Sequence, residues 1–246
     1  MTEAALIEIF SSIQGEGPCI GFRQLFIRFA LCNLSCHYCD TPFKPTAVCK
    51  VETAPGSETI CERDNPFGRE DISKLVEDWV QQQPGLHHSL SLTGGEPLLH
   101  EAVLLDWLPV LRKQLPIYLE TNGTLVEPLA KVLPLIDYIS MDIKLPSMSG
   151  EGELWDLHRE FLQIAKQKDV FVKIVLGRQT PSLEIENAAR LVQETAPNVD
   201  LILQPCTEAG GIKMTTQELL QAQQIAAAIH PATRVIPQVH NFLGVL

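Results

Sequence analysis

Short strand-like runs alternate with longer stretches of helical spacing along most of the chain, and this alternation limits the fold more than any other feature of the sequence. The runs are rich in β-branched and aromatic residues and cover residues 24–29, 89–93, 117–121, 138–141, 170–175 and 201–204. Such alternation predicts βα units and a parallel sheet. About six repeats indicate an α/β fold built as a modified, partial (β/α)6-type barrel rather than a closed eight-fold one.

Helical spacing is clear in several of the intervening stretches. Apolar residues recur at i, i+3 and i+4 from Ile72 onward, so residues 69–83 are predicted to form an amphipathic helix. The same spacing recurs over residues 154–165. Thr215 and Glu218 match a capping box, which predicts that another helix begins there.

Residues 44–68 interrupt this rhythm. They are rich in Pro, Gly, Thr and Glu and have no clear period, so we interpret them as a long loop or a small insertion. Cys49 and Cys61 lie in this segment and are too few for a metal site of their own, so we expect free thiols. Elsewhere no Ser/Gly-rich linker divides the chain, and we expect residues 1–246 to form a single domain.

Composition excludes some classes of function. The 246 residues carry a formal net charge of -11 at pH 7, which argues against binding nucleic acid through the overall field of the protein. No apolar run reaches about 18 residues, and the first residues lack a basic segment followed by an apolar one. We therefore expect a cytoplasmic protein that acts on a small molecule, without a nucleic acid or a membrane as partner.

Three of the seven cysteines lie close together just after the first predicted strand. Cys32, Cys36 and Cys39 form a C-x3-C-x2-C pattern, with His37 inside it. The number and placement of the cysteines do not suit a disulfide scaffold. Thiolates suit both a structural zinc ion, which would need a fourth ligand, and an iron-sulfur cluster, so the residue types alone leave both open.

The C-x3-C-x2-C spacing resembles that of the radical S-adenosylmethionine (SAM) enzymes. The resemblance implies a 4Fe-4S cluster on Cys32, Cys36 and Cys39, with one iron left open for the amino and carboxylate groups of SAM. An electron from the cluster then splits SAM to give a 5'-deoxyadenosyl radical. The sequence TGGEP at residues 93–97, at the end of a predicted strand, resembles the motif of these enzymes that meets the amino group of SAM.

Further polar residues follow the predicted strands, and the carboxyl ends of parallel strands share one rim. Asp142 and Lys144 follow one strand, and Gln204 closes another. A polar turn with an Asn-Gly pair at residues 120–124 is expected to be an ordinary turn unless Glu120 or Asn122 faces the cavity. The cofactor-binding residues implied by the resemblance are Tyr38, Cys39, Asp40, Gly95, Glu96, Asp142, Ile143, Lys144 and Gln204.

A narrower resemblance comes from several motifs together. The segments IFSSIQGEG (residues 9–17), FIRF (26–29) and CDT (39–41), combined with the cysteine triplet and TGGEP, closely resemble the 7-carboxy-7-deazaguanine synthase family. This family converts 6-carboxy-5,6,7,8-tetrahydropterin to 7-carboxy-7-deazaguanine with loss of ammonia, on the route to queuosine and other deazapurines. The resemblance thus implies a carbon-nitrogen lyase in a single radical SAM domain.

Arg28 is the residue whose chemistry best suits a carboxylated substrate. If Leu25, Ile27 and Phe29 share one strand face, Arg28 lies on the other, where its guanidinium invites a carboxylate or forms a salt bridge. The substrate-binding residues implied by the resemblance are Ile13, Gln14, Gly15, Glu16, Arg28, Thr93, His240 and, through its terminal carboxylate, Leu246. The hydroxyl of Thr41 is implied to bind Mg2+, with substrate and water as the other oxygen ligands.

The resemblance also implies partners. An electron donor such as a flavodoxin or a ferredoxin would reduce the cluster, and the chain would form a homodimer. Two other functions remain open at this point: a glycyl-radical-enzyme activase, which shares the cysteine spacing, and a structural zinc-binding interaction module.

Overall fold

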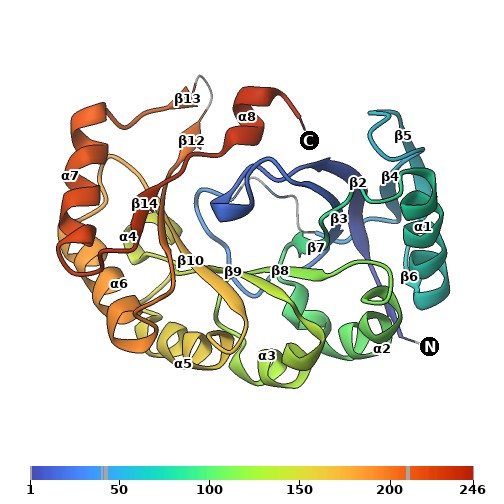
Figure 1. The fold of residues 1–246 in the computed structure, drawn as a ribbon, viewed down its shortest axis with the longest axis horizontal. Helices are drawn as coiled ribbons and strands as arrows, with labels where there is room; N and C mark the ends of the chain where they lie inside the picture. The colour runs from blue at the N-terminus through green and yellow to red at the C-terminus, as the bar shows by residue number, and fades with distance from the viewer. Residues whose placement is uncertain (1, 40, 42–43, 209–210, 246) are drawn as a thin grey trace.

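The computed structural model describes residues 2–39, 41, 44–208 and 211–245. Its centre is a ten-stranded sheet that curves into an open barrel, with most helices on the outer side (Figure 1). Seven neighbouring strands of this sheet run parallel: β3 (Arg23–Phe29), β7 (Ser89–Gly94), β8 (Ile117–Thr121), β9 (Tyr138–Asp142), β10 (Asp169–Leu176), β11 (Leu201–Pro205) and β14 (Thr233–Val235). The first six coincide with the predicted strands, and β14 adds a short seventh.

Burial on both faces explains why the parallel strands are apolar almost throughout. In β10 every residue after Asp169 is buried, including Lys173, as expected for strands covered by helices outside and by side chains inside. The helices that cover the outer face are α1 (Arg69–Gln82), α2 (Glu101–Leu111), α3 (Val126–Val132), α5 (Trp155–Ala165), α6 (Ser182–Thr195) and α7 (Thr216–Ala227). The core lies between these helices and the sheet.

Local sequence signals for the helices are confirmed. In α1 the buried side chains are Ile72, Val76 and Trp79, which follow the predicted i, i+4 and i+7 spacing. At the start of α7, Thr215 accepts a hydrogen bond from the backbone of Glu218, whose side chain bonds back to Thr215.

The N-terminal strands were not predicted. β2 (Leu6–Ile13) pairs antiparallel with β3 along its length, whereas β1 (Glu3–Ala4) pairs with β6 (Phe67–Gly68). A short 3-10 turn (Gly17–Cys19) then connects β2 to β3. The polar segment at residues 14–17 therefore forms a turn at the end of a strand.

Of the two interpretations of residues 44–68, the long loop is wrong, because these residues form strands. They contain β4 (Val48–Glu52) and β5 (Ile60–Asp64), a hairpin that adds to the edge of the sheet because β4 pairs parallel with β2. β5 is largely exposed and charged, so it carries no apolar period. Cys49 is fully buried and Cys61 partly so, and both are free thiols, as expected.

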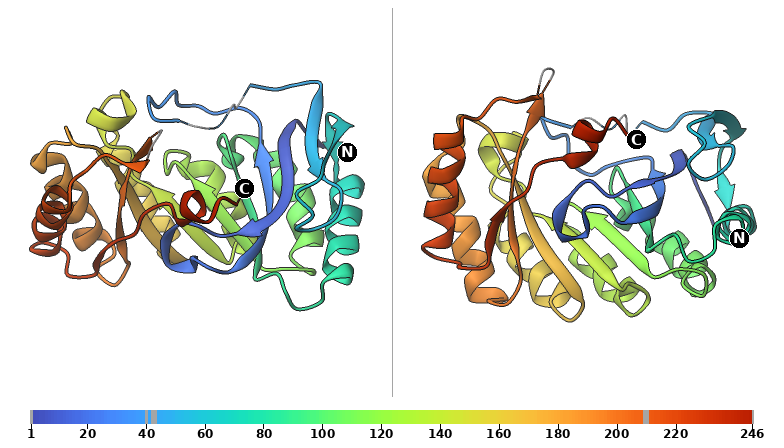
Figure 2. Two further views of the ribbon diagram at one scale, coloured as in Figure 1. Left: turned by 90° about the horizontal axis from the view of Figure 1, so that it is seen from above. Right: turned by 45° about the horizontal axis from the view of Figure 1, so that its top comes forward.

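The chain ends by crossing the open side of the barrel. After β14 it passes above the strands to a short helix, α8 (Val239–Leu243), as the two further views show (Figure 2). The backbone N–H of Val239 donates to the carbonyl of Gly15 at 2.8 Å, so the tail is attached to the turn after β2. None of the described helices combines the length and apolar character needed to cross a membrane.

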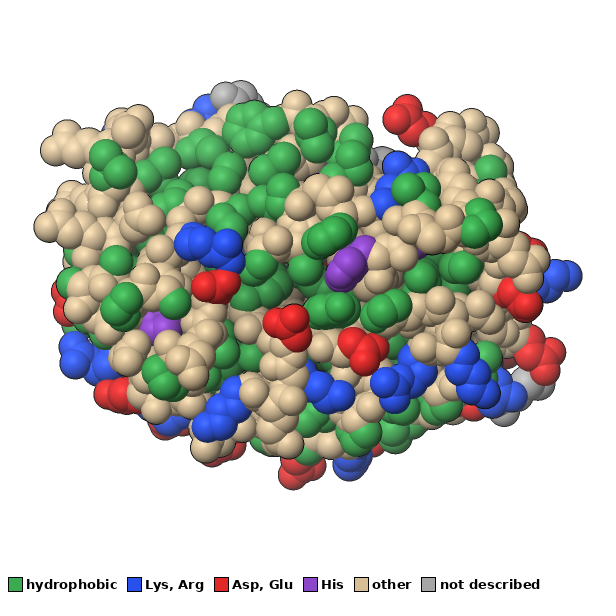
Figure 3. All heavy atoms as spheres, viewed as in Figure 1, with side chains coloured by type: hydrophobic (Ala, Val, Ile, Leu, Met, Phe, Trp, Pro, Cys, Tyr) green, Lys and Arg blue, Asp and Glu red, His purple; other side chains and the backbone are tan. Residues whose placement is uncertain are grey.

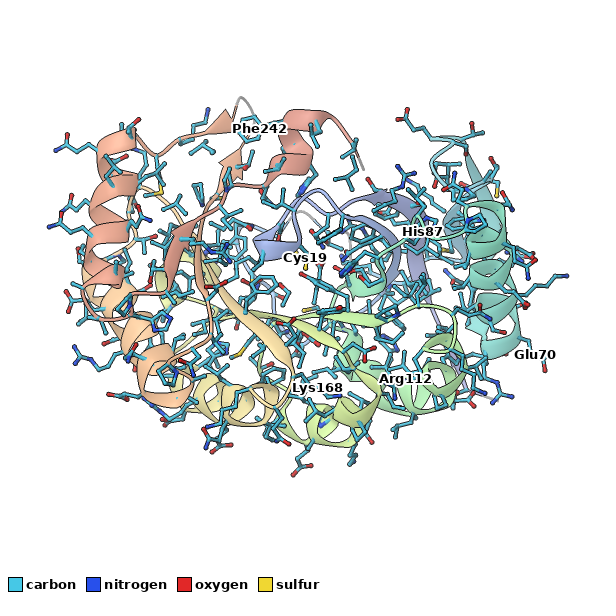
Figure 4. All side chains as sticks on the ribbon, viewed as in Figure 1. Cys19, Glu70, His87, Arg112, Lys168 and Phe242 are labelled. Atoms are coloured by element: carbon cyan, nitrogen blue, oxygen red, sulfur yellow. The ribbon has the colours of Figure 1, made fainter. Side chains whose placement is uncertain are left out.

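One face of the molecule separates apolar from charged side chains. Hydrophobic side chains gather in the upper half of the view in Figure 3, whereas charged ones gather toward the lower edge, where the outer helices lie in Figure 1. At the lower edge Figure 4 places Lys168 and Arg112, while Cys19 lies near the centre of the barrel. Cys19 packs there against Tyr118, Phe171 and Ile202, which close the barrel interior on that side.

Candidate active site

A cavity occupies the barrel interior at the carboxyl ends of the parallel strands. Its wall combines the cysteine loop after β3, the ends of β7 to β11, the turn after β2 and the tail around α8. The predicted site residues that line it are Ile13, Gln14, Gly15, Glu16, Arg28, Cys32, Cys36, Tyr38, Cys39, Thr41, Thr93, Gly95, Asp142, Lys144, Gln204 and His240. Asp40 and Leu246 lie outside the described residues.

Two predicted residues are buried behind this wall. Glu96 is fully buried, and Ile143 lies in the hydrophobic core with its backbone N–H bonded to the carbonyl of Lys173 at 2.9 Å. Their side chains support the wall, and their parts in cofactor binding stay predictions.

The cysteine loop is held by contacts from the segment after β9. The backbone N–H of His37 donates to the carbonyl of Ser149 at 3.0 Å, and that of Ser35 donates to the carboxylate of Glu151 at 2.7 Å. Burial raises the pKa of the Cys32 and Cys36 thiols, so both are protonated at neutral pH in the absence of a metal. Bound iron would displace these protons.

The donor set suits an iron-sulfur cluster. All three thiols line one cavity wall, and Cys39 is the most exposed of them. Within the described ranges, no three His, Cys, Asp or Glu side chains stand close enough together to hold one metal ion.

Two glycines allow the end of β7 to lie against the cysteine loop. Gly94 has a φ of 104°, and a Cβ on Gly95 would collide with the backbone carbonyl of Leu31. The N–H groups of Gly95 and Glu96 donate to the carbonyls of Phe29 and Leu31 at 2.9 and 2.8 Å. The TGGEP segment thus fixes the position of the loop that carries the cysteines.

Glu96 organises the turn that follows β8. Its carboxylate accepts hydrogen bonds from the Thr121 hydroxyl at 2.9 Å, from the Asn122 backbone at 2.8 Å and from the Leu98 backbone at 3.1 Å. Burial raises the pKa of Glu96 to about 7, and these hydrogen bonds oppose that effect.

The segment of residues 120–124 is part of the site, so its interpretation as an ordinary turn is wrong. Glu120, Thr121 and Asn122 line the cavity. The carboxylate of Glu120 accepts from the amide of Gln14 at 3.0 Å and from the hydroxyl of Thr93 at 2.8 Å. Alternation along β8 places Glu120 on the same strand face as Tyr118. No signal in the sequence indicated that this face is turned toward the cavity.

Buried charged side chains from β9, β10 and the segment after β9 also line the cavity. Lys144 pairs with Asp142 at 2.7 Å and donates to the hydroxyl of Tyr38 at 3.1 Å. Lys173, which the sequence analysis missed, pairs with Glu16 and lies 3.7 Å from Asp142. A lysine within an apolar strand was the available signal, since buried lysines are rare unless paired.

Glu16 is surrounded by donors. Its carboxylate accepts from the amides of Gln204 at 3.2 Å and Gln238 at 2.9 Å in addition to Lys173. Burial would raise the pKa of Glu16, but the attraction of Lys173 and these hydrogen bonds outweigh it and lower the pKa to about 2. Glu16 is therefore a carboxylate at any physiological pH.

Arg28 forms the salt bridge that its position suggested, and it also faces the cavity. Its guanidinium pairs with Glu8 of β2 at 2.7 Å, lies over the ring of Phe10 and lines the cavity. The side chain remains 28% exposed, which leaves donors available to a ligand.

His240 lies directly against the turn after β2. A Cβ on Gly15 would meet the backbone nitrogen of His240 at 2.6 Å, so only glycine allows the tail to lie this close. Residues from the two ends of the chain therefore form one wall of the cavity.

Comparisons with known proteins agree with this geometry. Residues 26–192 match the radical SAM superfamily. The chain is 48% identical to the 7-carboxy-7-deazaguanine synthase of Geobacter sulfurreducens over 247 aligned positions, covering 99% of this chain and 98% of that protein. It is 37% identical to the protein of the same name from Archaeoglobus fulgidus, covering 98% and 99%.

Solved structures show the same fold. The QueE structure from Escherichia coli superposes with a TM-score of 0.63 at 21% identity, covering 96% of this chain and 94% of that one. A structure of TYW1 with a lysine-pyruvate adduct gives 0.52 at 13% identity, covering 83% and 73%. These findings favour neither the activase nor the zinc module. The chain belongs to the radical SAM superfamily and, within it, to the 7-carboxy-7-deazaguanine synthase family.

Proposed function

We propose that this chain converts 6-carboxy-5,6,7,8-tetrahydropterin to 7-carboxy-7-deazaguanine with loss of ammonia, a step toward queuosine and related deazapurines. One observation carries the proposal. A single cavity is lined by the three cysteines of a radical SAM enzyme, by Arg28 and by amide and carboxylate groups suited to a pterin, in a chain 48% identical to a synthase of that name.

Cys32, Cys36 and Cys39 would hold the 4Fe-4S cluster. When bound, the cluster and SAM supply an adenosyl radical that removes a hydrogen atom from the substrate and later returns it. The chain's own part is to hold the thiols on the wall beside Gly95 and to bound the cavity on the side of the tail with His240.

The cofactor half of the cavity is the wall of buried charge. We assign SAM to the space bordered by Tyr38, Gly95, Asp142 and Lys144, where a carboxylate and an ammonium are available to its polar groups. Gln204 adjoins this space through Glu16. Asp40, which follows Cys39 in the sequence, is proposed to bind SAM from the resemblance alone.

The substrate half lies between β2, β3 and the tail. Arg28 binds the substrate carboxylate, and Gln14 and Glu16 bind the amide and amino edge of the pterin. Gln14 is suited to this because its amide is already oriented by Gln24 at 2.9 Å and by Glu120. Ile13, Gly15, Thr93, His240 and the terminal carboxylate of Leu246 complete this half.

Mg2+ is the third cofactor that we propose. Thr41 lines the cavity together with Cys39, and a hydroxyl is a hard oxygen ligand. Substrate and water would provide the remaining oxygens.

The proposal extends to partners and location. The exposed face of the cysteine loop would receive an electron from a flavodoxin or a ferredoxin in the cytoplasm. A homodimer is supported by exposed apolar side chains such as Phe242, which is 65% exposed on α8 (Figure 4).

The test is anaerobic reconstitution with iron and sulfide, followed by incubation with SAM, dithionite, Mg2+ and 6-carboxytetrahydropterin. Mass spectrometry should detect 7-carboxy-7-deazaguanine. Formation of 5'-deoxyadenosine without this product would contradict the proposed substrate and retain the radical SAM chemistry.

A further inference from the structure

Lys173 lies between the two halves of the cavity. It occupies the middle of β10, in register with Asp142 of β9, and its side chain points into the barrel, where it lines the cavity. The residue is only 7% exposed, although the residues around it in β10 are apolar. A buried ammonium needs partners, because an unpaired one would lose its hydration without compensation.

The partners of Lys173 come from both halves. Its Nζ pairs with the carboxylate of Glu16, in the substrate half, and lies 3.7 Å from Oδ2 of Asp142, in the cofactor half. Asp142 Oδ2 also pairs with Lys144 at 2.7 Å. Two further charged groups act on this pair, namely Glu120 of β8 on Lys173 and His240 of α8 on Glu16.

Glu16 retains room for a ligand. Its carboxylate has about four acceptor positions, and three are used by Lys173, Gln204 and Gln238. One more N–H group can therefore donate to it from the cavity, as the amino edge of a pterin would.

We propose that Lys173 is a positioning residue that holds Glu16 as an oriented hydrogen-bond acceptor for the substrate and fixes it relative to Asp142. The inference rests on the proposed function, because it assumes that Glu16 contacts the pterin. Without Lys173, Glu16 loses the cation whose attraction lowers its pKa, so its pKa rises and the carboxylate takes up a proton more readily as pH falls. A protonated Glu16 no longer accepts hydrogen bonds in the same way.

The test measures binding without turnover. Wild type, K173M, K173R, E16Q and, as a matched control, K74M would be reconstituted and loaded with SAM. Lys74 is an exposed lysine of α1, outside the cavity lining. The Kd of 6-carboxytetrahydropterin would be measured anaerobically by calorimetry, without reductant, between about pH 6.5 and about pH 8.5. If binding requires Glu16 to lose one proton, the Kd changes by up to about tenfold per pH unit below the pKa of Glu16.

We expect the ratio of the K173M Kd to the wild-type Kd to exceed about tenfold at the lower pH. The ratio should fall as pH rises, because a larger fraction of Glu16 in K173M is then ionised and can accept a hydrogen bond from the pterin. Using the ratio removes any titration of the ligand itself. K173R should restore a nearly constant ratio, E16Q should bind weakly at every pH, and K74M should match wild type.

Different failures are distinguishable. If wild type does not bind the pterin, the proposed function fails, and with it the role of Lys173. If wild type binds and the K173M ratio is the same at every pH, Lys173 acts otherwise than through Glu16 and the inference is overturned.

A second variant covers the case in which K173M does not fold. E16Q/K173M removes both charges of the pair, and its Kd for SAM would be compared with that of E16Q. If SAM binds several-fold more weakly to the double variant than to E16Q, the result supports the proposal that Lys173 also acts on Asp142. Equal Kd values overturn that part of the proposal.

Discussion

At the scale of single residues, the site depends on a glycine and a buried carboxylate that fix the positions of neighbouring loops. Gly95 allows β7 to lie against the loop that carries the cysteines, and Glu96 bonds to the turn after β8. Both residues position neighbouring segments, so substitutions of either can be tested by measuring stability, without an activity assay.

We expect Gly95→Ala to destabilise the fold and the cluster loop. The new Cβ would collide with the carbonyl of Leu31, and overpacking of this kind costs about 1–3 kcal/mol. Urea unfolding should show a lower free energy of unfolding, and reconstituted protein should contain less iron. Gly152→Ala is the control, because a Cβ there meets nothing within 4 Å.

We expect Glu96→Gln to change the pH dependence of stability in the cluster-free protein. The pKa of Glu96 is raised in the fold from 4.5 to about 7, so the folded state holds this proton more tightly than the unfolded chain. The stabilising contribution is complete below about pH 4.5 and is lost as pH rises through about 7, by about 3 kcal/mol.

The measurement for Glu96 is a comparison of two curves. His87 and His158 act in the opposite direction, since their lowered pKa values of about 4 reduce stability as pH falls below 6.5. The difference between wild type and E96Q cancels these histidines. A constant difference across this range would show that Glu96 does not titrate there.

At the scale of elements, the tail from β14 through α8 packs against the turn after β2, so C-terminal and N-terminal segments meet at the cavity. Val239 bonds to Gly15, and His240 lies against the same turn. The α8 helix is short and its residues are at least partly exposed, so its position depends on these contacts.

We expect one alanine added after Leu246 to impair turnover, because it moves the terminal carboxylate away from the place that the proposed function gives it. kcat/KM for the pterin should fall at least several-fold while iron content is unchanged. Activity equal to wild type would contradict a role for this carboxylate. An alanine added before Met1 is the matched control.

At the scale of the whole molecule, the sheet links all parts of the chain. The β4–β5 hairpin at one edge and β14 at the other belong to the same ten strands, and one core runs between the sheet and its helices. From this continuity we predict a single domain, in which residues 44–68 are an insertion at the sheet edge.

We expect the cluster-free protein to unfold in one cooperative transition. Trp79 of α1 and Trp155 of α5 report from different sides of the barrel. Variants that retain one or the other tryptophan should give urea midpoints that coincide with that of far-UV circular dichroism. Separate midpoints would indicate two units.

The sequence by itself determined those features that depend on neighbours along the chain. Strand and helix periods located six parallel strands, the cysteine triplet is contiguous, and the rule that strand ends share a rim placed Asp142, Lys144 and Gln204 at one cavity. That Gly95 lies against the backbone of Leu31 came from the structure, because Leu31 is distant in sequence.

Only the tertiary structure decided the features that depend on distant partners. β4 and β5 are strands because β2 offers an unpaired edge, which no local period reveals. The partners of Glu120 and Lys173 are Gln14 and Glu16, which lie more than a hundred residues away in sequence, so only the fold brings each pair together. A buried charge is stable only with its partner, and the fold supplies that partner.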